Sequence, residues 1–424
     1  MPGAGTRTDG TTAEIPARCL DLTRLISRQG RGPLTGVDRV ELAYLRRLVD
    51  DPVPLFLLVA TRLGFVLLDG AGAQAVLDRI ERRVPWGAMD MIGRFRRKSP
   101  AGRRRAEADA RRLSIARCRP GGLAEMLRAH LPPGAAYLNT GHSNLSDAVL
   151  RAWKDAVKGR ASILVHDMIP LDFPQFQRPA VPQAFAAKMR SVSAHADLAI
   201  YNSRATRDDA ERWFAEWGRR PDGVVAHLGV ELPAPDPSHL PEGLDLGRPY
   251  FLTLGTIEPR KNHALLLDVW ETLATELSDE AMPVLIIAGS RGWENEALFR
   301  RLDSSPLMGR HVVERAGLAD AAVAALMAGA AGMLFPSLAE GFGLPPLEAA
   351  SLGVPVVCNR LPVYEELLGN IPVYAESGDV YLWAQTITKL VEKRQAEHVR
   401  TGANPSATVI PTWADHFNLV LKVT

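Results

Sequence analysis

Short apolar runs alternate with longer amphipathic segments along most of this chain. A short apolar run bounded by glycine or proline is typical of a buried strand, whereas apolar residues three and four apart are typical of a helix. Such alternation indicates an α/β fold with a parallel sheet. In the first half the pattern predicts strands at 135–139, 162–166, 198–202 and 224–229, and helices at 147–157, 181–194 and 204–217.

The same alternation returns after a break. Residues 233–241 are polar and rich in proline, which is typical of a linker between domains. We therefore expect an N-terminal domain over 18–232, a linker at 233–247, a second domain over 248–405 and a terminal helix within 411–424. In the second domain the pattern predicts strands at 250–255, 284–289, 312–317, 332–337 and 354–358, and helices at 264–273, 321–330 and 381–394.

The beginning of the chain follows a similar pattern. Residues 18–26 are predicted as the first strand, followed by a glycine- and proline-rich loop at 28–36 and a helix at 37–49. Residues 55–60 and 65–68 are predicted to form a hairpin. Residues 1–17 are polar, with no apolar signal core, so they are expected to be a disordered lead.

Composition narrows the class of protein. The chain has 424 residues, 46% of them hydrophobic, and a net charge of +2. This balance is ordinary for a globular protein and gives no reason to expect a nucleic-acid partner. Cys19, Cys118 and Cys358 lie far apart, so they suggest neither a disulfide framework nor a metal site. We expect a reducing, cytoplasmic setting, and no apolar run has membrane-spanning length.

One segment, 86–119, is unusually basic. Between residues 94 and 119 there are eleven lysines and arginines and two acids. Apolar residues, among them Trp86, Met91 and Phe95, stand just before or within it. Basic residues beside exposed apolar ones can dock on anionic lipid, so one hypothesis is peripheral contact with the inner face of the cytoplasmic membrane. The alternative is a solvated, partly disordered insertion.

The most distinctive stretch is 332–358. After its first predicted strand comes a glycine loop that begins at Glu340, and then a helix with Pro345 and Pro346 in its first turn, where no N–H is needed. That helix is predicted to end near Gly353, before a second buried strand.

This loop has the chemistry of an anion site. Unpaired N–H groups at a glycine loop and a helix N-terminus bind anions. Glu340 precedes the turn and Glu348 lies about one turn inside the helix, so a bound diphosphate would have a carboxylate near each end. A nucleotide-sugar has that layout, although a plain strand–turn–helix with an acidic first turn is the alternative. The candidate backbone donors are Gly341, Phe342, Gly343 and Leu344.

Other strand ends carry candidate residues. His166 closes a predicted strand and is followed by Asp167, at a position where side chains of a parallel sheet point to ligands. Arg260 and Lys261 stand at another strand-to-helix turn and suit a diphosphate. Three glycines at strand ends are candidates for close approach to a ligand: Gly36, Gly255 and Gly289.

These motifs resemble those of a known family. Glu340 and Glu348, with Gly-Phe-Gly between them and Phe-Pro-Ser before them, resemble the E-x7-E signature of the retaining family 4 glycosyltransferases, also called glycosyl transferases group 1. His166-Asp167 with Pro170 is similar to the family's HD-x-x-P stretch. The stretch 255–262 is similar to that of its polysaccharide-assembly mannosyltransferases. The stretch Thr35-Gly36-Val37-Asp38-Arg39 is similar to the family's GG-x-x-R turn, with Thr35 in place of the first Gly. Thr256 stands where many members of the family have Arg.

The resemblance implies a fold and a set of roles. The fold would be GT-B, an α/β architecture with two Rossmann-like domains facing an interdomain cleft, with the acceptor in the first domain and the donor in the second. The terminal helix would cross back to the first domain. Arg260 and Lys261 would neutralise the leaving diphosphate, Glu348 would bind the ribose, Glu340 the donor sugar, and His166 the sugar or the acceptor.

The function that we expect is transfer of a hexosyl unit, with retention and without metal or other cofactor. The donor would be a GDP-mannose-like or UDP-linked sugar, and the acceptor a saccharide or lipid-linked saccharide in surface polysaccharide or glycolipid assembly. The absence of a D-x-D pair at a strand end is the reason to expect no metal. The alternatives are a nucleotide-sugar 2-epimerase-like GT-B enzyme and a non-catalytic sugar-nucleotide-binding protein; a glycosidase would leave the loop and the cations without a purpose.

Overall fold

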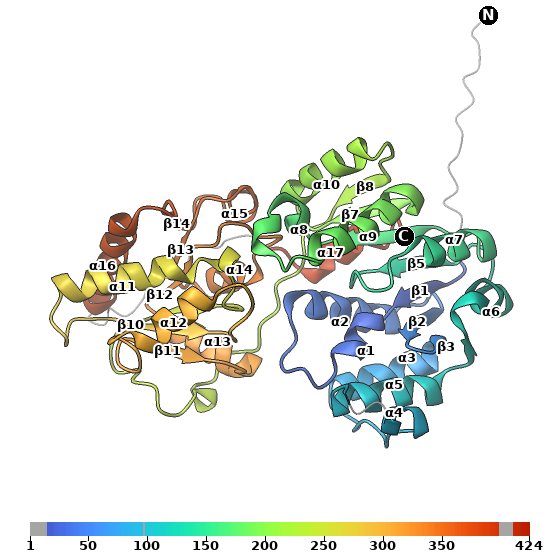
Figure 1. The fold of residues 1–424 in the computed structure, drawn as a ribbon, viewed down its shortest axis with the longest axis horizontal. Coiled ribbons are helices and arrows are strands. Elements are labelled where there is room, and N and C mark those ends of the chain that lie inside the picture. Colours follow the sequence, from blue (N-terminus) through green and yellow to red (C-terminus); the bar gives the residue numbers. More distant parts are fainter. Residues whose placement is uncertain (1–14, 96–97, 398–409) are drawn as a thin grey trace, which may run out of the picture. The chain divides into compact units, whose positions relative to one another are not determined.

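The computed structural model describes residues 15–95, 98–397 and 410–424. The chain divides into two compact units: unit 1 is Met1–Gly30 with Glu41–Ser162, and unit 2 is Arg31–Val40 with Ile163–Thr424 (Figure 1). Parts of three expectations lie outside the described residues, namely most of the N-terminal lead, two residues of the basic segment, and the end of the second predicted domain. The predicted domain boundaries stay predictions.

Unit 1 is built on a mixed sheet. Its strands run in the order β4-β3-β2-β1-β5, with β1 parallel to β2 and β5, and with β3 antiparallel to β2 and β4. The β2–β3 hairpin confirms the predicted one. The strands are β1 (Arg18–Asp21), β2 (Leu55–Thr61), β3 (Gly64–Leu68), β4 (Ala116–Cys118) and β5 (Ala136–Asn139). The helices are α1 (Thr23–Arg28), α2 (Gly36–Val49), α3 (Gly70–Ile80), α4 (Met91–Phe95), α5 (Ala101–Leu113), α6 (Leu123–His130) and α7 (Asp147–Ala156), with a 3-10 turn, η1 (Pro120–Gly122).

The first strand is shorter than predicted. The prediction of a strand over 18–26 is wrong beyond Asp21, because the chain turns there into helix α1. The Asp21 carboxylate accepts a hydrogen bond from the Thr23 N–H at 3.0 Å, which stabilises the turn. Leu25 and Ile26 are still buried, but from a helix, so their apolar character alone could not distinguish the two elements.

The described part of the basic segment is folded into unit 1, which contradicts the alternative of a partly disordered insertion. Helix α5 packs against α1 and α3, and β4 extends the sheet. Three of the six residues that α5 buries are alanines, Ala106, Ala108 and Ala110, and the other three are charged. Several arginines are held internally, for example Arg111 by Asp90 at 2.6 Å. Part of the positive charge therefore serves the fold.

Strand β6 (Ala161–Val165) runs from unit 1 into unit 2, and the strand order continues with β7 (Leu198–Tyr201) and β8 (Asp222–Val225). β7 and β8 are parallel, and β8 begins two residues earlier and ends four residues earlier than predicted. The helices of this part are α8 (Ile169–Asp172), α9 (Val181–His195) and α10 (Arg204–Glu216), with a 3-10 turn, η2 (Pro174–Phe176).

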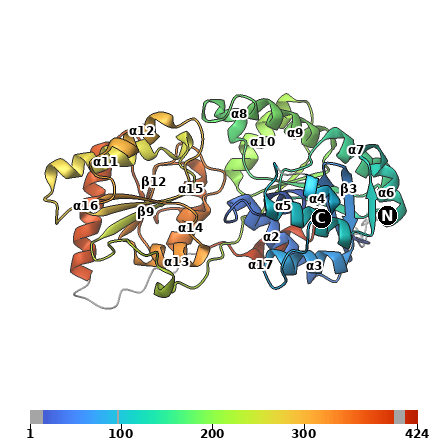
Figure 2. The same cartoon turned by 60° about the horizontal axis from the view of Figure 1, so that its bottom comes forward.

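The second sheet is parallel throughout, as the alternation of apolar runs predicts. Its order is β11-β10-β9-β12-β13-β14. Helices α11 and α12 cover one face, and α13 and α14 the other (Figure 2). The strands are β9 (Tyr250–Leu254), β10 (Val284–Ala288), β11 (Val312–Arg315), β12 (Gly332–Phe335), β13 (Val356–Cys358) and β14 (Val373–Tyr374). The helices are α11 (His263–Glu276), α12 (Glu296–Ser304), α13 (Asp320–Gly329), α14 (Leu344–Ser351), α15 (Pro362–Leu368), α16 (Val380–Glu397) and α17 (Trp413–Val420), with 3-10 turns η3 (Pro237–His239) and η4 (Pro259–Lys261).

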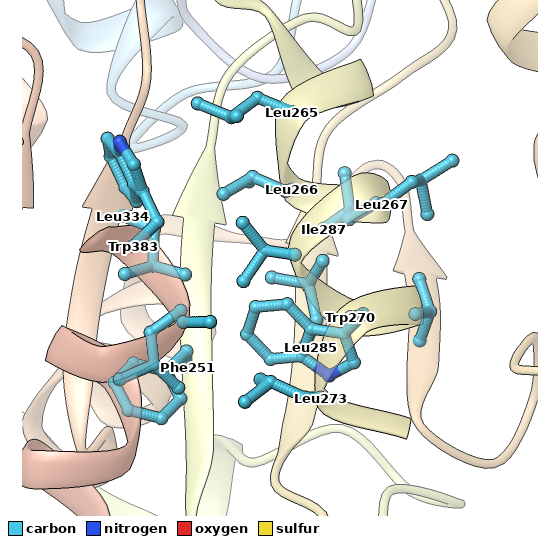
Figure 3. Close-up of a cluster of buried hydrophobic side chains, with 14 of the residues drawn as sticks. Phe251, Leu265, Leu266, Leu267, Trp270, Leu273, Leu285, Ile287, Leu334 and Trp383 are labelled. Carbon is cyan, nitrogen blue, oxygen red and sulfur yellow. The ribbon is translucent and has the colours of Figure 1, made fainter. Parts of the chain in front are cut away.

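A dense apolar core holds this sheet to α11 and α16 (Figure 3). Trp270 and Trp383 are fully buried, and Phe251 meets Trp270 edge to face with ring centroids 6.1 Å apart. The Trp270 indole N–H donates to the Pro283 carbonyl oxygen at 3.0 Å, so its polar atom is satisfied. This core fixes β9 and β10, whose carboxyl ends carry two of the loops described below.

Helix α17 packs on the segment that follows β8. The Val230 N–H donates to the Pro411 carbonyl oxygen at 3.1 Å, and a Cβ added at Gly229 would lie 2.3 Å from the Trp413 nitrogen. The prediction of strand over 226–229 is wrong: Ala226 and Leu228 are buried there although they lie outside β8, so burial alone could not distinguish the two. Among the described residues, none of the helices combines the length and the apolar character needed to cross a bilayer.

The loops after β9 and β10 meet at two glycines. A Cβ added at Gly289 would lie 1.8 Å from the Gly255 carbonyl oxygen, so the backbones could not keep this distance with a larger residue. We predict that Gly289→Ala lowers the free energy of unfolding by about 1–3 kcal/mol, because the loops must separate. Gly378→Ala, where nothing lies within 4 Å of the added atom, is the matched control. Equal urea midpoints for the two variants would contradict the prediction.

Candidate active site

Helix α14 begins at a glycine that no other residue could replace without strain. Gly343 has φ of +88°, and a Cβ added there would lie 2.5 Å from Cε1 of the buried Tyr364. The next two helical positions after Leu344 are prolines, which lack an N–H. Among the described residues, no acceptor is found for the backbone N–H groups of the preceding loop, which are those of Gly341, Phe342, Gly343 and Leu344. This loop therefore presents a row of donors.

Glu340, directly before these donors, lies between two cations. Its Oε1 accepts from Lys261 Nζ at 2.6 Å, and its Oε2 accepts from Arg260 Nη1 at 2.8 Å. Burial alone would raise the pKa of the Glu340 carboxyl, but Lys261 and Arg260 outweigh it and hold that pKa at about 2. Glu340 is thus a carboxylate. It lies together with Arg260 and Lys261, which the sequence analysis assigned to the diphosphate.

The two cations have different surroundings. Arg260 also donates from Nε and Nη2 to Glu258, at 3.1 and 2.6 Å, and from Nη1 to the Ala339 carbonyl oxygen at 2.7 Å. Four of its five N–H groups are therefore used within the protein. Lys261 donates one hydrogen bond, to Glu340, among the described residues. Lys261 has donors to offer to a ligand, whereas Arg260 mainly fixes Glu340.

The His166-Asp167 stretch lies directly against the glycine loop. A Cβ added at Gly341 would lie 2.6 Å from the His166 carbonyl oxygen and 3.0 Å from Asp167 Cβ. Asn202 Nδ2 donates to the same His166 carbonyl at 2.8 Å, and the Thr206 hydroxyl donates to the Gly341 carbonyl at 3.1 Å. These bonds fix the backbone of both stretches. His166 itself is 6% exposed.

The surroundings of Asp167 shift the pKa of its carboxyl. Burial raises the pKa of Asp167, and Arg260 opposes that shift. Its carboxylate accepts from the Ile169 N–H at 3.1 Å. Ser203, predicted as a helix cap, does cap α10, since its hydroxyl accepts from the Thr206 N–H at 3.0 Å.

Glu348 lies inside α14, and its side chain is 3% exposed. Its Oε1 accepts from Arg39 Nη1 at 2.8 Å, and Arg39 Nη2 also donates to Asp320 Oδ1 at 2.7 Å. Burial raises the pKa of Glu348, and Arg39 lowers it. In the same region, a Cβ added at Gly36 would lie at an ordinary 3.6 Å from a Leu344 methyl group, so the predicted glycine loop at 28–36 does end beside α14.

The other two candidate glycines have a different role. The Gly255 N–H donates to the Ala288 carbonyl oxygen at 3.1 Å, and the Gly289 N–H donates to the Arg315 carbonyl oxygen at 2.9 Å. Their donors are thus occupied by the protein. Gly255 has φ of +138°, and Lys261 Cε lies 3.3 Å from where its Cβ would be. Gly255 therefore makes room for the Lys261 side chain, which is a reason for glycine that does not involve a ligand.

Sequence reasoning assigned no role to three side chains that build this site: Arg39, Glu258 and Asp320. Glu258 and Arg260 stand two residues apart with opposite charges, which was a usable signal. Arg39 ends the stretch that is similar to the family's GG-x-x-R turn, but its partner Asp320 lies 281 residues further along the chain and gave no signal.

The buried ion pairs of Glu340 make a prediction about acid stability. With a folded pKa of about 2 and an ordinary value of 4.5, Glu340 contributes stability that is present above pH 4.5 and is lost as the pH falls toward 2. The difference in unfolding free energy between the wild type and Glu340→Gln should therefore shrink over this window, from on the order of 3 kcal/mol at neutral pH. Chemical denaturation at several pH values measures it. Glu365→Gln, which alters an exposed ion pair, should show a small and nearly constant difference.

Comparison with known proteins finds a family match for the second half of the chain. Residues 238–404 match the model of the family Glycosyl transferases group 1. The serotype-specific mannosyltransferase WbdA of Escherichia coli is 31% identical over 277 residues, which are 62% of this chain and 33% of that protein. The O-antigen chain mannosyltransferase B of Escherichia coli is 37% identical over 131 residues, which are 31% of this chain and 34% of that protein. The chain thus spans about a third of the length of these relatives.

A likeness to solved structures covers much more of the chain. The crystal structure of Anabaena Alr3699/HepE in complex with UDP-glucose superposes with a TM-score of 0.59 at 16% identity, over 89% of this chain and 90% of that one. The same protein in complex with UDP and glucose gives a TM-score of 0.58. At this identity the likeness shows the fold, which is GT-B and of the α/β class. Taken together, the chain has the GT-B fold, and its residues 238–404 match the glycosyl transferases group 1 model.

Proposed function

We propose that this chain is a retaining, family 4 glycosyltransferase that moves a hexosyl unit from a nucleotide-diphosphate sugar to a saccharide or lipid-linked saccharide. The observation that carries the proposal is the row of N–H groups at 341–344, which have no acceptor in the described part of the chain and lie beside Lys261 and Glu340 and one turn from Glu348. Donors at a helix N-terminus next to an ammonium group suit a diphosphate. Carboxylates at both ends of such a site suit the two sets of hydroxyls.

The main chemical task would be electrostatic. Departure of a nucleoside diphosphate develops negative charge, which Lys261 and the N–H groups of 341–344 stabilise. Because these groups are held by the fold before the reaction, little reorganisation is needed. Arg260 contributes by fixing Glu340 and by adding positive charge behind Lys261. The protein's own cations supply the charge that a metal ion supplies elsewhere, which is why we propose a metal-independent reaction.

The remaining residues would place the sugar and the acceptor. Glu340 accepts from hydroxyls of the donor sugar, and Glu348 accepts from the ribose. His166, in contact through its backbone with Gly341, lies close enough to the glycine loop to meet the transferred sugar or the acceptor. For retention we propose attack from the face of the leaving group, with the departing phosphate oxygen taking the acceptor proton.

The relatives bear on the choice of donor and setting. Those named above are mannosyltransferases of O-antigen assembly, which favours a GDP-mannose-like donor and a role in surface polysaccharide synthesis. The solved structure with UDP-glucose keeps a UDP-sugar as the second choice. We retain the predicted division of labour, with the acceptor in domain 18–232, the donor in domain 248–405, the linker at 233–247 and the helix within 411–424 returning to the first domain.

Two other functions are compatible with a nucleotide-sugar site. A 2-epimerase-like GT-B enzyme would act on the nucleotide-sugar without a saccharide acceptor, and a binding protein would not turn it over. The buried Glu340–Lys261 pair favours the transferase, because a protein that only binds has no need for groups aimed at a developing charge. Product analysis separates the three, since only the transferase gives both a free nucleoside diphosphate and an extended saccharide.

Nucleotide binding is the first test. We predict that GDP, or else UDP, raises the melting temperature of the purified protein, because a ligand of the folded state stabilises it by mass action. ADP should have less effect. Glu348→Ala and Lys261→Ala should abolish most of the shift, through loss of the ribose and phosphate contacts respectively.

The control for this experiment is Lys389→Ala, which removes an exposed lysine from α16, a helix that holds none of the proposed site residues. It should keep the full ligand shift. Failure of all three diphosphates to stabilise the wild type would contradict the donor-site assignment at its centre.

We also propose that unit 1 makes peripheral contact with anionic membrane. Phe95 is 82% exposed, Met91 64% and Leu63 55%, and exposed Arg62 and Arg94 lie beside them in the sequence. A surface cavity of about 340 Å³ is lined by residues from the β2–β3 turn, from α4 and from α5: Thr61, Arg62, Leu63, Ile92, Phe95 and Arg111. Exposed apolar side chains among arginines suit a lipid surface, where a lipid-linked acceptor would be found.

Point substitutions test this proposal better than deletion of residues 86–119 would. That deletion would remove α5 and β4, which are part of the folded unit 1. Phe95→Glu combined with Leu63→Glu should reduce co-sedimentation with vesicles of phosphatidylglycerol and phosphatidylcholine by several-fold, since apolar insertion is lost and like charges repel. Tyr381→Glu, at a residue that is 62% exposed in α16, should leave pelleting unchanged. Equal pelleting of all three proteins would refute the membrane proposal and leave the transferase proposal intact.

A further inference from the structure

Arg39 makes a contact that the proposed reaction does not yet use. Its guanidinium bridges two acids of unit 2, with Nη1 at 2.8 Å from Glu348 Oε1 and Nη2 at 2.7 Å from Asp320 Oδ1. The three residues come from α2, α14 and α13. Glu348 is the carboxylate that we assign to the ribose, so Arg39 touches a binding residue directly.

The backbone around Arg39 is held in place. Asp38, which is fully buried, accepts from both the N–H and the hydroxyl of Thr35, at 2.8 and 2.7 Å. The Arg39 N–H donates to the Thr35 carbonyl oxygen at 2.9 Å. These bonds fix the first turn of α2 and therefore the point from which the Arg39 side chain extends. Its guanidinium is thus directed to Glu348 by a preorganised helix start.

The contact uses only one of the two Glu348 oxygens. Oε1 is taken by Arg39, while Oε2 has no hydrogen-bond partner among the described residues. The Glu348 side chain is 3% exposed, whereas that of Arg39 is 26% exposed. A buried carboxylate with one oxygen fixed and the other available is arranged to accept a hydrogen bond from a ligand in a defined direction.

From this geometry we propose that Arg39 is a positioning residue for the donor ribose: it fixes the Glu348 carboxylate through Oε1, so that Oε2 accepts from a ribose hydroxyl. The inference rests on the proposed function, because it takes Glu348 to be the ribose ligand. It also gives residues 31–40, which belong to unit 2, a role in donor binding, although the donor is otherwise assigned to residues 248–405.

Charge supports the same reading. The charged groups near Glu348 are Arg39 and Asp320; burial raises the pKa of Glu348, Arg39 lowers it, and Asp320 raises it. Without Arg39 the carboxyl would gain a proton at a higher pH. A protonated carboxyl is a weaker acceptor, so nucleotide affinity in a variant without Arg39 should begin to fall at a higher pH than in the wild type.

The experiment compares two ligands on several variants. The probes are the nucleoside diphosphate that stabilises the wild type and its 2′,3′-dideoxy analogue, with dissociation constants from calorimetry at several pH values. Arg39→Met should weaken binding of the ribose form by roughly tenfold or more, as expected for a charge-assisted hydrogen bond. Binding of the dideoxy form should hardly change, because it has no hydroxyl to offer.

Further variants separate positioning from folding. Arg39→Met and Glu348→Gln together should weaken binding no more than Glu348→Gln alone, because both act on one contact. Arg39→Lys should recover part of the affinity. Asp320→Asn removes the outer ion pair and should leave the preference for ribose intact. Circular dichroism and melting temperatures confirm that each variant is folded.

Each outcome has a distinct meaning. If Glu348→Gln weakens only the ribose form but Arg39→Met weakens neither or both forms equally, the role of Arg39 is refuted while the donor site stands. If Glu348→Gln makes no distinction between the two ligands, the ribose assignment of Glu348 itself fails. The inference holds if Arg39→Met weakens binding of the ribose form alone, and if that binding begins to fall at a higher pH than it does in the wild type.

Discussion

A buried carboxylate between two cations is the interaction on which this site depends. Glu340 follows β12, and Arg260 and Lys261 follow β9, which is the neighbouring strand of the same sheet. The ion pairs therefore join two strand ends that the sheet already places side by side. Removing one partner would leave the others charged in a buried setting, which is more costly than the pair itself is stabilising. The ion pairs therefore fix the positions of Glu340, Arg260 and Lys261 relative to one another.

Glycines make that arrangement possible by letting backbones approach. Gly255 leaves room for the Lys261 side chain, Gly289 lets two loops touch, and Gly341 brings the His166 carbonyl against the donor loop. Gly343 has a left-handed backbone just before α14, where no acceptor for the loop N–H groups is found among the described residues. Glycines of this region thus serve different physical purposes, and those at 341 and 343 belong to the proposed phosphate site.

The division of roles between Arg260 and Lys261 follows from counting hydrogen bonds. The planar guanidinium of Arg260 donates hydrogen bonds to Glu258, Glu340 and a carbonyl oxygen, and these bonds fix its position. Lys261 has a single protein acceptor among the described residues and a flexible stem, which suits an ammonium group that follows a phosphate. Two adjacent cations that look equivalent in the sequence are therefore a structural and a ligand-facing residue.

The sequence by itself determined the α/β class, the parallel direction of the strands in the second sheet, and the strand–loop–helix motif within 332–358. Hydrophobic periodicity and the backbone preferences of glycine and proline are local properties, so the sequence alone reveals them. It failed where local signals were ambiguous. Leu25 and Ile26 are buried from a helix as they would be from a strand, and α5 buries alanines within an arginine-rich stretch. Only the tertiary structure decided which charges meet. Arg39 reaches Glu348 across 309 residues of chain, and no pattern of nearby residues encodes a contact that depends on where the backbone finally goes.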